Sequence, residues 1–96
     1  MFGSIAIQAL PRTEKEDIFN KVDKVIEYIA STGLNYVVGP FETTVEGDFD
    51  QLMEIIRKTH EILLEENIGV SCYIKTSFTP AGDGWTIEDK TKKYNK

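Results

Sequence analysis

The 96-residue sequence predicts one α+β domain in which two helices pack against one face of a four-stranded antiparallel sheet. Three observations predict this class. Apolar and polar residues alternate in the first and last segments of residues 4–79, two longer segments have helical periodicity, and two short segments rich in β-branched residues lie between them. We expect residues 4–79 to form the core of this single domain, with residues 80–96 as a short C-terminal extension.

The first predicted strand has the sequence SIAIQALP, residues 4–11. Ile5, Ile7 and Ala9 fall on one face, because side chains alternate with a period of two along a strand. Pro11 ends the strand.

The first predicted helix follows directly. Apolar residues recur at intervals of three and four from Ile18 to Ile29, which indicates an amphipathic helix. Thr13 followed by Glu16 matches a capping box, in which both side chains bond to backbone at the start of a helix. Gly33 is placed to end the helix.

The middle of the chain predicts a hairpin. Residues 34–39 (LNYVVG) and 42–47 (ETTVEG) have strand composition, and Gly39-Pro40 between them is typical of a turn. Gly47 closes the second strand, and we expect a backbone conformation there that only glycine adopts easily.

The second predicted helix spans residues 48–67, and Asp48 or Asp50 can cap it. Asn67 and Gly69 end it. Alternation returns in VSCYIKTSF, residues 70–78, which predicts the last strand.

The predicted order is therefore β-α-β-β-α-β, the ferredoxin-like arrangement. The right-handed crossover rule places the first strand in the middle of the sheet, beside the third and fourth. Toward the C-terminus, residues 79–85 (TPAGDGW) predict a flexible connection and residues 86–94 (TIEDKTKKY) a short helix, which Thr86 and Asp89 can cap.

Composition disfavours several functions. The net charge of −5 disfavours nucleic acid, whose backbone requires a basic surface. Cys72 has no second cysteine to pair with, His60 has no HxxxH partner, and no phosphate-binding glycine-rich loop or nucleophile motif occurs. We therefore expect no catalytic residue, no metal site and no cofactor.

The sequence lacks a signal-peptide pattern and a membrane-spanning apolar run, so we expect a cytoplasmic protein without membrane insertion.

Two helices can cover only one face of the sheet, and polar or small residues are predicted on the other. These are Ser4, Ala6, Gln8, Thr44, Glu46, Ser71, Tyr73 and Lys75. This face could be exposed to water, packed against another subunit, or the wall of a ligand site. Thr43 and Val45 should face the helices, and His60 lies at the flank of the apolar stripe of the second helix.

The sequence from Gly39 to Lys75 resembles the thiamine-binding protein family of small ferredoxin-like proteins. The matching features, in order, are Thr43-Thr44, Glu46-Gly47, Asp48-Phe49, His60-Glu61 and the tail TIEDKTKKY. The resemblance extends from about Ser4 to Tyr94.

The resemblance implies a non-enzymatic subunit of a homodimer or homotetramer that binds thiamine or its hydroxymethylpyrimidine portion. Polar groups able to bond an aminopyrimidine are Gln8, Thr43, Thr44, Ser71 and Glu46, with His60 on the helix above them. Aromatic rings able to stack on the ligand are Tyr36, Phe41 and Tyr73. The alternative is a structural or regulatory oligomer that binds a different small metabolite or an anion, and an enzyme is the third choice.

Overall fold

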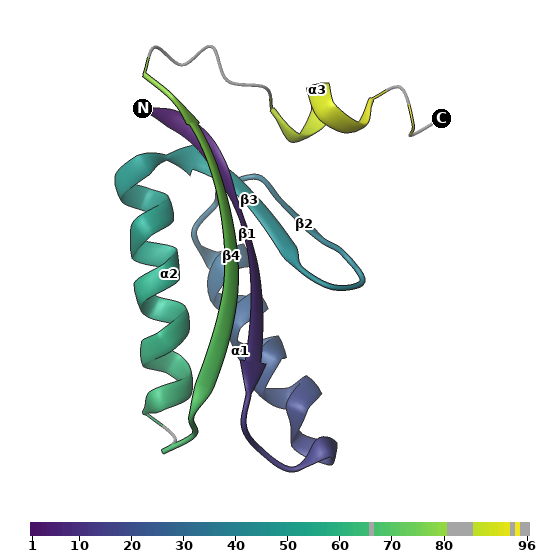
Figure 1. The fold of residues 1–96 in the computed structure, drawn as a ribbon, viewed down its shortest axis with the longest axis vertical. Coiled ribbons are helices and arrows are strands. Elements are labelled where there is room, and N and C mark those ends of the chain that lie inside the picture. Colours follow the sequence, from purple (N-terminus) through teal and green to yellow (C-terminus); the bar gives the residue numbers. More distant parts are fainter. Residues whose placement is uncertain (66, 81–85, 93, 95–96) are drawn as a thin grey trace.

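The computed structural model describes residues 1–65, 67–80, 86–92 and 94. Two helices, α1 and α2, lie on one side of a four-stranded sheet, and the C-terminal helix α3 lies apart from them (Figure 1). The elements, in order, are β1 (Phe2–Pro11), a 3-10 turn (Lys15–Asp17), α1 (Ile18–Ser31), β2 (Tyr36–Val38), β3 (Thr43–Asp48), α2 (Phe49–Leu64), β4 (Val70–Thr79) and α3 (Ile87–Thr91).

The strand order β2-β3-β1-β4, with antiparallel neighbours, confirms the predicted fold. β1 is central, but its two neighbours cover it unequally. β4 pairs with β1 along its whole length, from Phe2 opposite Thr79 to Pro11 opposite Val70. β3 pairs with β1 only as far as Ile7, which lies opposite Thr43. The last four residues of β1 therefore have no strand on the β3 side.

The core lies between the sheet and the two long helices. Ile29, Val45, Leu52 and Leu63 are completely buried, and Ile5 of the central strand is 1% exposed. Burial of each such side chain contributes about 1.5–3 kcal/mol to the free energy of unfolding. The periodicity of the sequence identified these positions because it depends on which residues face the core.

The start of α1 differs from the prediction. The helix begins at Ile18 after the 3-10 turn, and its N-cap residue is Asp17, so the prediction that Thr13 caps it is wrong. The side chain of Glu16, the predicted partner of Thr13, lies outside the described part of the chain. Arg12 N still donates to Gly69 O (2.7 Å), so the chain remains tied to the start of β4 at Arg12 and turns only afterwards.

Gly47 also differs from the prediction, because it lies within β3 opposite Gly3. In the described chain, left-handed backbone occurs at Gly33 (φ 76°) and Asn67 (φ 58°) and not at Gly47. Space explains this glycine instead. A Cβ at Gly47 would lie 3.2 Å from Gln51 Oε1 and 3.3 Å from Leu34.

The tail helix confirms its predicted cap. Asp89 N donates to Thr86 Oγ1 (3.0 Å), and Thr86 N donates to Asp89 Oδ2 (3.1 Å). Ile87 at the start of α3 is buried, and its N–H donates to Glu46 Oε2 (2.8 Å), so the tail is anchored on β3. Residues 81–85 of the predicted flexible connection lie outside the described residues.

We expect Gly3→Ala to destabilise the fold more than Gly47→Ala. A Cβ at Gly3 would collide with the backbone oxygen of Ser77 on β4, which cannot move without breaking the sheet. A Cβ at Gly47 meets only side-chain ends that can shift. Thermal and urea unfolding should show a loss of about 2 kcal/mol or more at Gly3 and about 1 kcal/mol or less at Gly47. Equal losses would contradict this assignment.

We expect Glu46→Ala to release the C-terminal helix, because it removes the acceptor for Ile87 N. Trypsin should then cut after Lys90 and Lys92 faster, by about fivefold to tenfold if the bond contributes about 1–1.5 kcal/mol. Glu42→Ala is the matched control, since Glu42 lies just before the same strand and its carboxylate contacts the exposed Lys75 and not the C-terminal helix in the described part of the chain. Equal cleavage rates in wild type and Glu46→Ala would show that Glu46 does not hold the tail.

Candidate functional site

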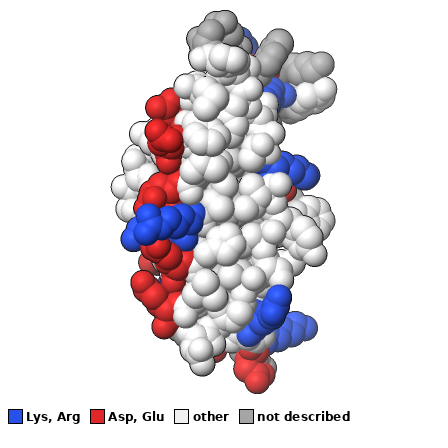
Figure 2. Space-filling model, turned by 60° about the vertical axis from the view of Figure 1, so that its left-hand side comes forward, with Lys and Arg blue, Asp and Glu red and all other residues white. Residues whose placement is uncertain are grey.

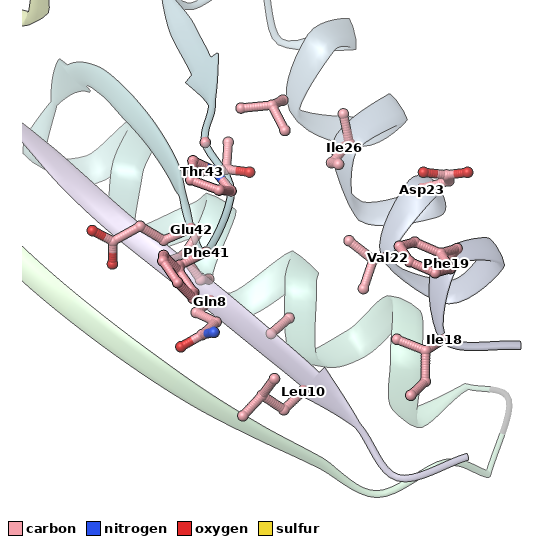
Figure 3. A pocket seen from close by; sticks show the side chains of 15 residues that line it. Gln8, Leu10, Ile18, Phe19, Val22, Asp23, Ile26, Phe41, Glu42 and Thr43 are labelled. Atoms are coloured by element: carbon pink, nitrogen blue, oxygen red, sulfur yellow. The ribbon is translucent and has the colours of Figure 1, made fainter. Parts of the chain in front are cut away.

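A cleft lies between α1 and the start of β3 (Figure 3). Its volume is about 370 Å³, within the range of small-molecule sites. One wall is formed by the end of β1 and the β2–β3 turn, and the other by the first half of α1. The lining residues are Ile7, Gln8, Ala9, Leu10, Ile18, Phe19, Val22, Asp23, Ile26, Val38, Gly39, Pro40, Phe41, Glu42 and Thr43.

The cleft exists because β3 starts too late to cover the end of β1. Gly39 N donates to Glu42 O (2.9 Å), which shows that Glu42 turns its backbone groups toward β2. Backbone groups alternate in direction along an antiparallel strand, so Thr43 turns toward Ile7. Ala9 lies two residues beyond Ile7 and therefore points its N–H and C=O to the same side of β1, toward β3. No residue of β3 extends far enough to form hydrogen bonds with them.

Pro11 reduces the number of unpaired backbone groups at this free edge. Pro11 is the next residue of β1 to face the β3 side, and it has no N–H to leave unpaired there. The exposed edge is thus reduced to one full donor–acceptor pair, at Ala9. A planar ligand with a donor and an acceptor on one edge could bond to that pair as a short strand does.

Aromatic rings stand at the mouth of the cleft. Phe19 on α1 and Phe41 in the β2–β3 turn are each 78% exposed. Phenylalanine is rarely this exposed without a partner, and two such rings on facing walls could stack on a ligand.

The charge of the cleft is negative. Asp23 and Glu42 are its charged residues, and no lysine or arginine is among the described residues that line it. Lys75 approaches Glu42 from outside, with Nζ 3.6 Å from Oε1. Lys75 is 79% exposed, so this pair neutralises Glu42 only weakly. The cleft therefore favours a cation.

The structure brings some of the predicted site residues to this cleft and separates others from it. Gln8, half-buried, and Thr43, 8% exposed, both line it, as does Phe41. Thr44 points to the opposite side of the sheet, opposite Ala6. Neighbouring threonines of one strand therefore line different hollows.

Glu46 is engaged in structural bonds. Asn35 Nδ2 donates to its Oε1 (2.8 Å), and Ile87 N donates to its Oε2 (2.8 Å). Both of its oxygens therefore already accept hydrogen bonds that hold the fold together.

The remaining four predicted residues lie away from the cleft. Ser71 Oγ accepts from Arg12 (3.0 Å), and Tyr73 is 63% exposed opposite Gln8 on the far side of β1 from β3. Tyr36 packs against the core. His60 Nδ1 lies 2.7 Å from Ile56 O within α2, which makes Nδ1 the protonated nitrogen.

Sequence reasoning missed the α1 wall of the cleft. Phe19 and Asp23 were not predicted as site residues, although Phe19 lies beside Ile18 and outside the stripe that faces the core. A large aromatic residue outside a helix's apolar stripe is the signal that could have identified it.

Other parts of the described chain offer little chemistry. No group of three or more potential metal ligands occurs among the described residues. Burial raises the pKa of the Cys72 thiol, so the thiolate needed for nucleophilic attack is scarce at neutral pH. No helix in the described ranges is long and apolar enough to cross a bilayer.

Figure 2 shows a line of acidic side chains interrupted at its middle by basic ones, beside a broad uncharged surface. Such mixed pairs occur on α2, where Arg57 contacts Glu54 (3.6 Å) and Glu61 (2.9 Å), and Lys58 contacts Glu61 (3.5 Å). These exposed pairs neutralise one another and form no basic patch for nucleic acid.

Comparison with known proteins identifies relatives of the whole chain. A UPF0045 protein from Clostridium perfringens is 44% identical over 92 residues, 95% of each protein. A domain of unknown function, DUF77, from Bacillus cereus has a similar structure, with a TM-score of 0.87, 29% identity, and coverage of 98% of this chain and 90% of that one.

A further solved structure is that of a candidate thiamine biosynthesis/salvage protein from Thermotoga maritima, with a TM-score of 0.80, 30% identity, and coverage of 98% and 99%. The sequence also matches a family described as thiamine-binding protein over residues 5–95. This chain therefore belongs to the thiamine-binding protein family.

Proposed function

We propose that this chain is a non-catalytic protein that binds thiamine, or its hydroxymethylpyrimidine portion, in the cleft between α1 and the start of β3. The observation that carries the proposal is the combination in one cleft of an amide, a free strand edge, two exposed phenylalanines and two carboxylates, in a member of this family. Such a protein would buffer the vitamin or deliver it in the cytoplasm.

The aminopyrimidine ring fits the end of β1. It offers an amino donor and ring-nitrogen acceptors, and the Gln8 amide can both accept and donate. The N–H and C=O of Ala9 supply a second pair with fixed geometry. Leaving one of these groups unpaired once a ligand has covered it would cost about 1–3 kcal/mol, which favours a ligand that satisfies them all.

The thiazolium ring fits the mouth of the cleft. Its positive charge is attracted by Asp23 and Glu42, and its plane can stack on Phe19 or Phe41. Cation–π contact at exposed sites contributes about 0.5–1 kcal/mol. Contacts of these sizes are sufficient together for micromolar binding.

We also propose that the protein is a homodimer or homotetramer. The open face is the side of the sheet away from α1 and α2. Three large side chains project from it, namely Leu10 (42% exposed), Val37 (48%) and Tyr73 (63%). A second subunit would remove this apolar surface from water.

The cleft predicts different effects on two ligands. Gln8→Met keeps the shape of the side chain without its amide, so calorimetric titration should show about tenfold weaker binding of both thiamine and hydroxymethylpyrimidine. Asp23→Asn should weaken thiamine more than hydroxymethylpyrimidine, because only thiamine carries the thiazolium charge. Glu27→Gln is the matched control, an exposed carboxylate of α1 outside the cleft. Wild-type affinity for both ligands in Gln8→Met and Phe41→Ala would exclude this cleft, and no binding by wild type would overturn the proposed function.

Light scattering at micromolar concentration should return a dimer or tetramer mass. Tyr73→Glu should shift it toward the monomer, because assembly would bury a charge without a partner. Lys58→Glu, on the outer surface of α2, introduces a carboxylate at a site where we expect no effect. A monomer mass for wild type would contradict the proposed assembly.

A further inference from the structure

A second hollow lies on the open face of the sheet, beside α3 and toward the opposite end of β1 from Leu10, near which the second subunit proposed above would pack. Its volume is about 260 Å³. It shares no lining residue with the cleft, and it is bounded by two lysines and a set of hydroxyl groups. The lining residues used below are Ser4, Ala6, Thr44, Lys75, Ser77 and Lys90.

The strand register explains this composition. Ala6 of the central strand lies opposite Thr44 on one side and Lys75 on the other, and Ser4 lies opposite Ser77. These side chains therefore share one face of the sheet. Ala6 and Ser4 are small, so the floor over β1 is low, while longer side chains rise around it.

The side chains that line the hollow carry positive charge, whereas the net charge of the protein is negative. The chain has a net charge of −5, yet no acidic residue is among the described residues that line the hollow. Glu46, in the same row of the sheet as Ser4, has both carboxylate oxygens bonded, to Asn35 and to the backbone of Ile87. The two lysines therefore act on this space against two neighbouring carboxylates that lie outside its lining, Glu46 and the Glu42 that Lys75 contacts at 3.6 Å.

The first lysine is positioned by the fold. Lys90 Nζ donates to Ser4 Oγ (3.2 Å), and Ser4 is only 6% exposed, so this end of the hollow is fixed by a buried hydroxyl. Ser4 accepts in that bond, which leaves its hydroxyl hydrogen able to donate to a ligand. The Thr86 capping box and the Ile87–Glu46 bond hold α3, and with it Lys90, in place.

The second lysine is available at low cost. Lys75 contacts Glu42 at 3.6 Å and is 79% exposed, so that pair contributes little and can open. Lys75 and Lys90 can then donate to one anion from two sides. The hydroxyls of Ser4, Thr44 and Ser77 are further donors, and a tetrahedral oxyanion has enough oxygens to accept from several donors at once.

We propose that this hollow binds a phosphate group, either as inorganic phosphate or as the phosphate of a phosphorylated ligand. Phosphate carries about −1.5 to −2 charges at neutral pH and accepts strong charge-assisted hydrogen bonds from lysine. The proposal does not depend on what occupies the cleft, because the hollow and the cleft share no lining residue.

Calorimetric titration with inorganic phosphate tests the site. Wild type should bind saturably, and the affinity should fall as sodium chloride is raised, because the contacts are ionic. Lys90→Gln and Lys75→Gln should each weaken phosphate binding about threefold to tenfold, and the double variant should abolish saturable binding. Lys58→Gln is the matched control, an exposed lysine of α2 that removes the same charge far from the hollow.

Titration with thiamine monophosphate distinguishes the two sources of phosphate. A phosphorylated ligand is supported if it binds more tightly than thiamine and the double lysine variant removes this advantage. Free phosphate is supported if only inorganic phosphate responds to the lysine variants. The proposal is overturned if wild type does not bind phosphate in any form, or if Lys58→Gln loses as much affinity as the other single variants. In the double variant we expect thiamine binding to be unchanged or slightly tighter, because loss of Lys75 frees Glu42, and this keeps the result separate from the cleft.

Discussion

The unequal pairing of β1 is the constraint on which the candidate site depends. Ten residues of β1 pair with β4, but β3 stops at Ile7. A longer β3 would cover Ala9 and bring the β2–β3 turn against the start of α1, which would fill the cleft. The fold is complete without those pairings, because the core residues lie between the sheet and the two long helices. A binding edge is therefore left free at little cost to stability.

Glu46 plays a comparable role on the open face. Its carboxylate accepts from Asn35, just before β2, and from Ile87 at the start of α3. One side chain of β3 thus joins the hairpin to the C-terminal tail, and the tail in turn carries Lys90 to Ser4. The hollow on the open face exists in this form only because the tail is anchored there.

Most of the fold could be predicted from the sequence, since strand and helix periodicity report which residues face the core. The Thr86–Asp89 cap was also predictable, because both partners lie within one turn. The Glu46–Ile87 bond was not, since it joins residues 41 positions apart and leaves no periodic signal. The same holds for the Gly47 environment, where Leu34 and Gln51 come from other elements.

The candidate site was predicted only in part, for a related reason. The predicted region, the start of β3, does border the cleft, and Gln8 and Thr43 line it there. Local sequence, however, does not report which helix faces a strand end, so Phe19 and Asp23 were missed. Thr43 and Thr44 were predicted to face opposite sides of the sheet and do so, and of the two it is Thr43 that lines the cleft.

That alternation also links the two proposed sites. Glu42 lines the cleft and Lys75 lines the hollow, and both side chains project on the open face of the sheet, where their 3.6 Å contact joins the two linings. A cation in the cleft competes with Lys75 for Glu42, and an anion in the hollow competes with Glu42 for Lys75. Each ligand therefore frees the group that the other needs, which makes the coupling free energy between the sites favourable in sign. Because the Glu42–Lys75 pair is exposed and weak, the coupling is small, about 1 kcal/mol or less.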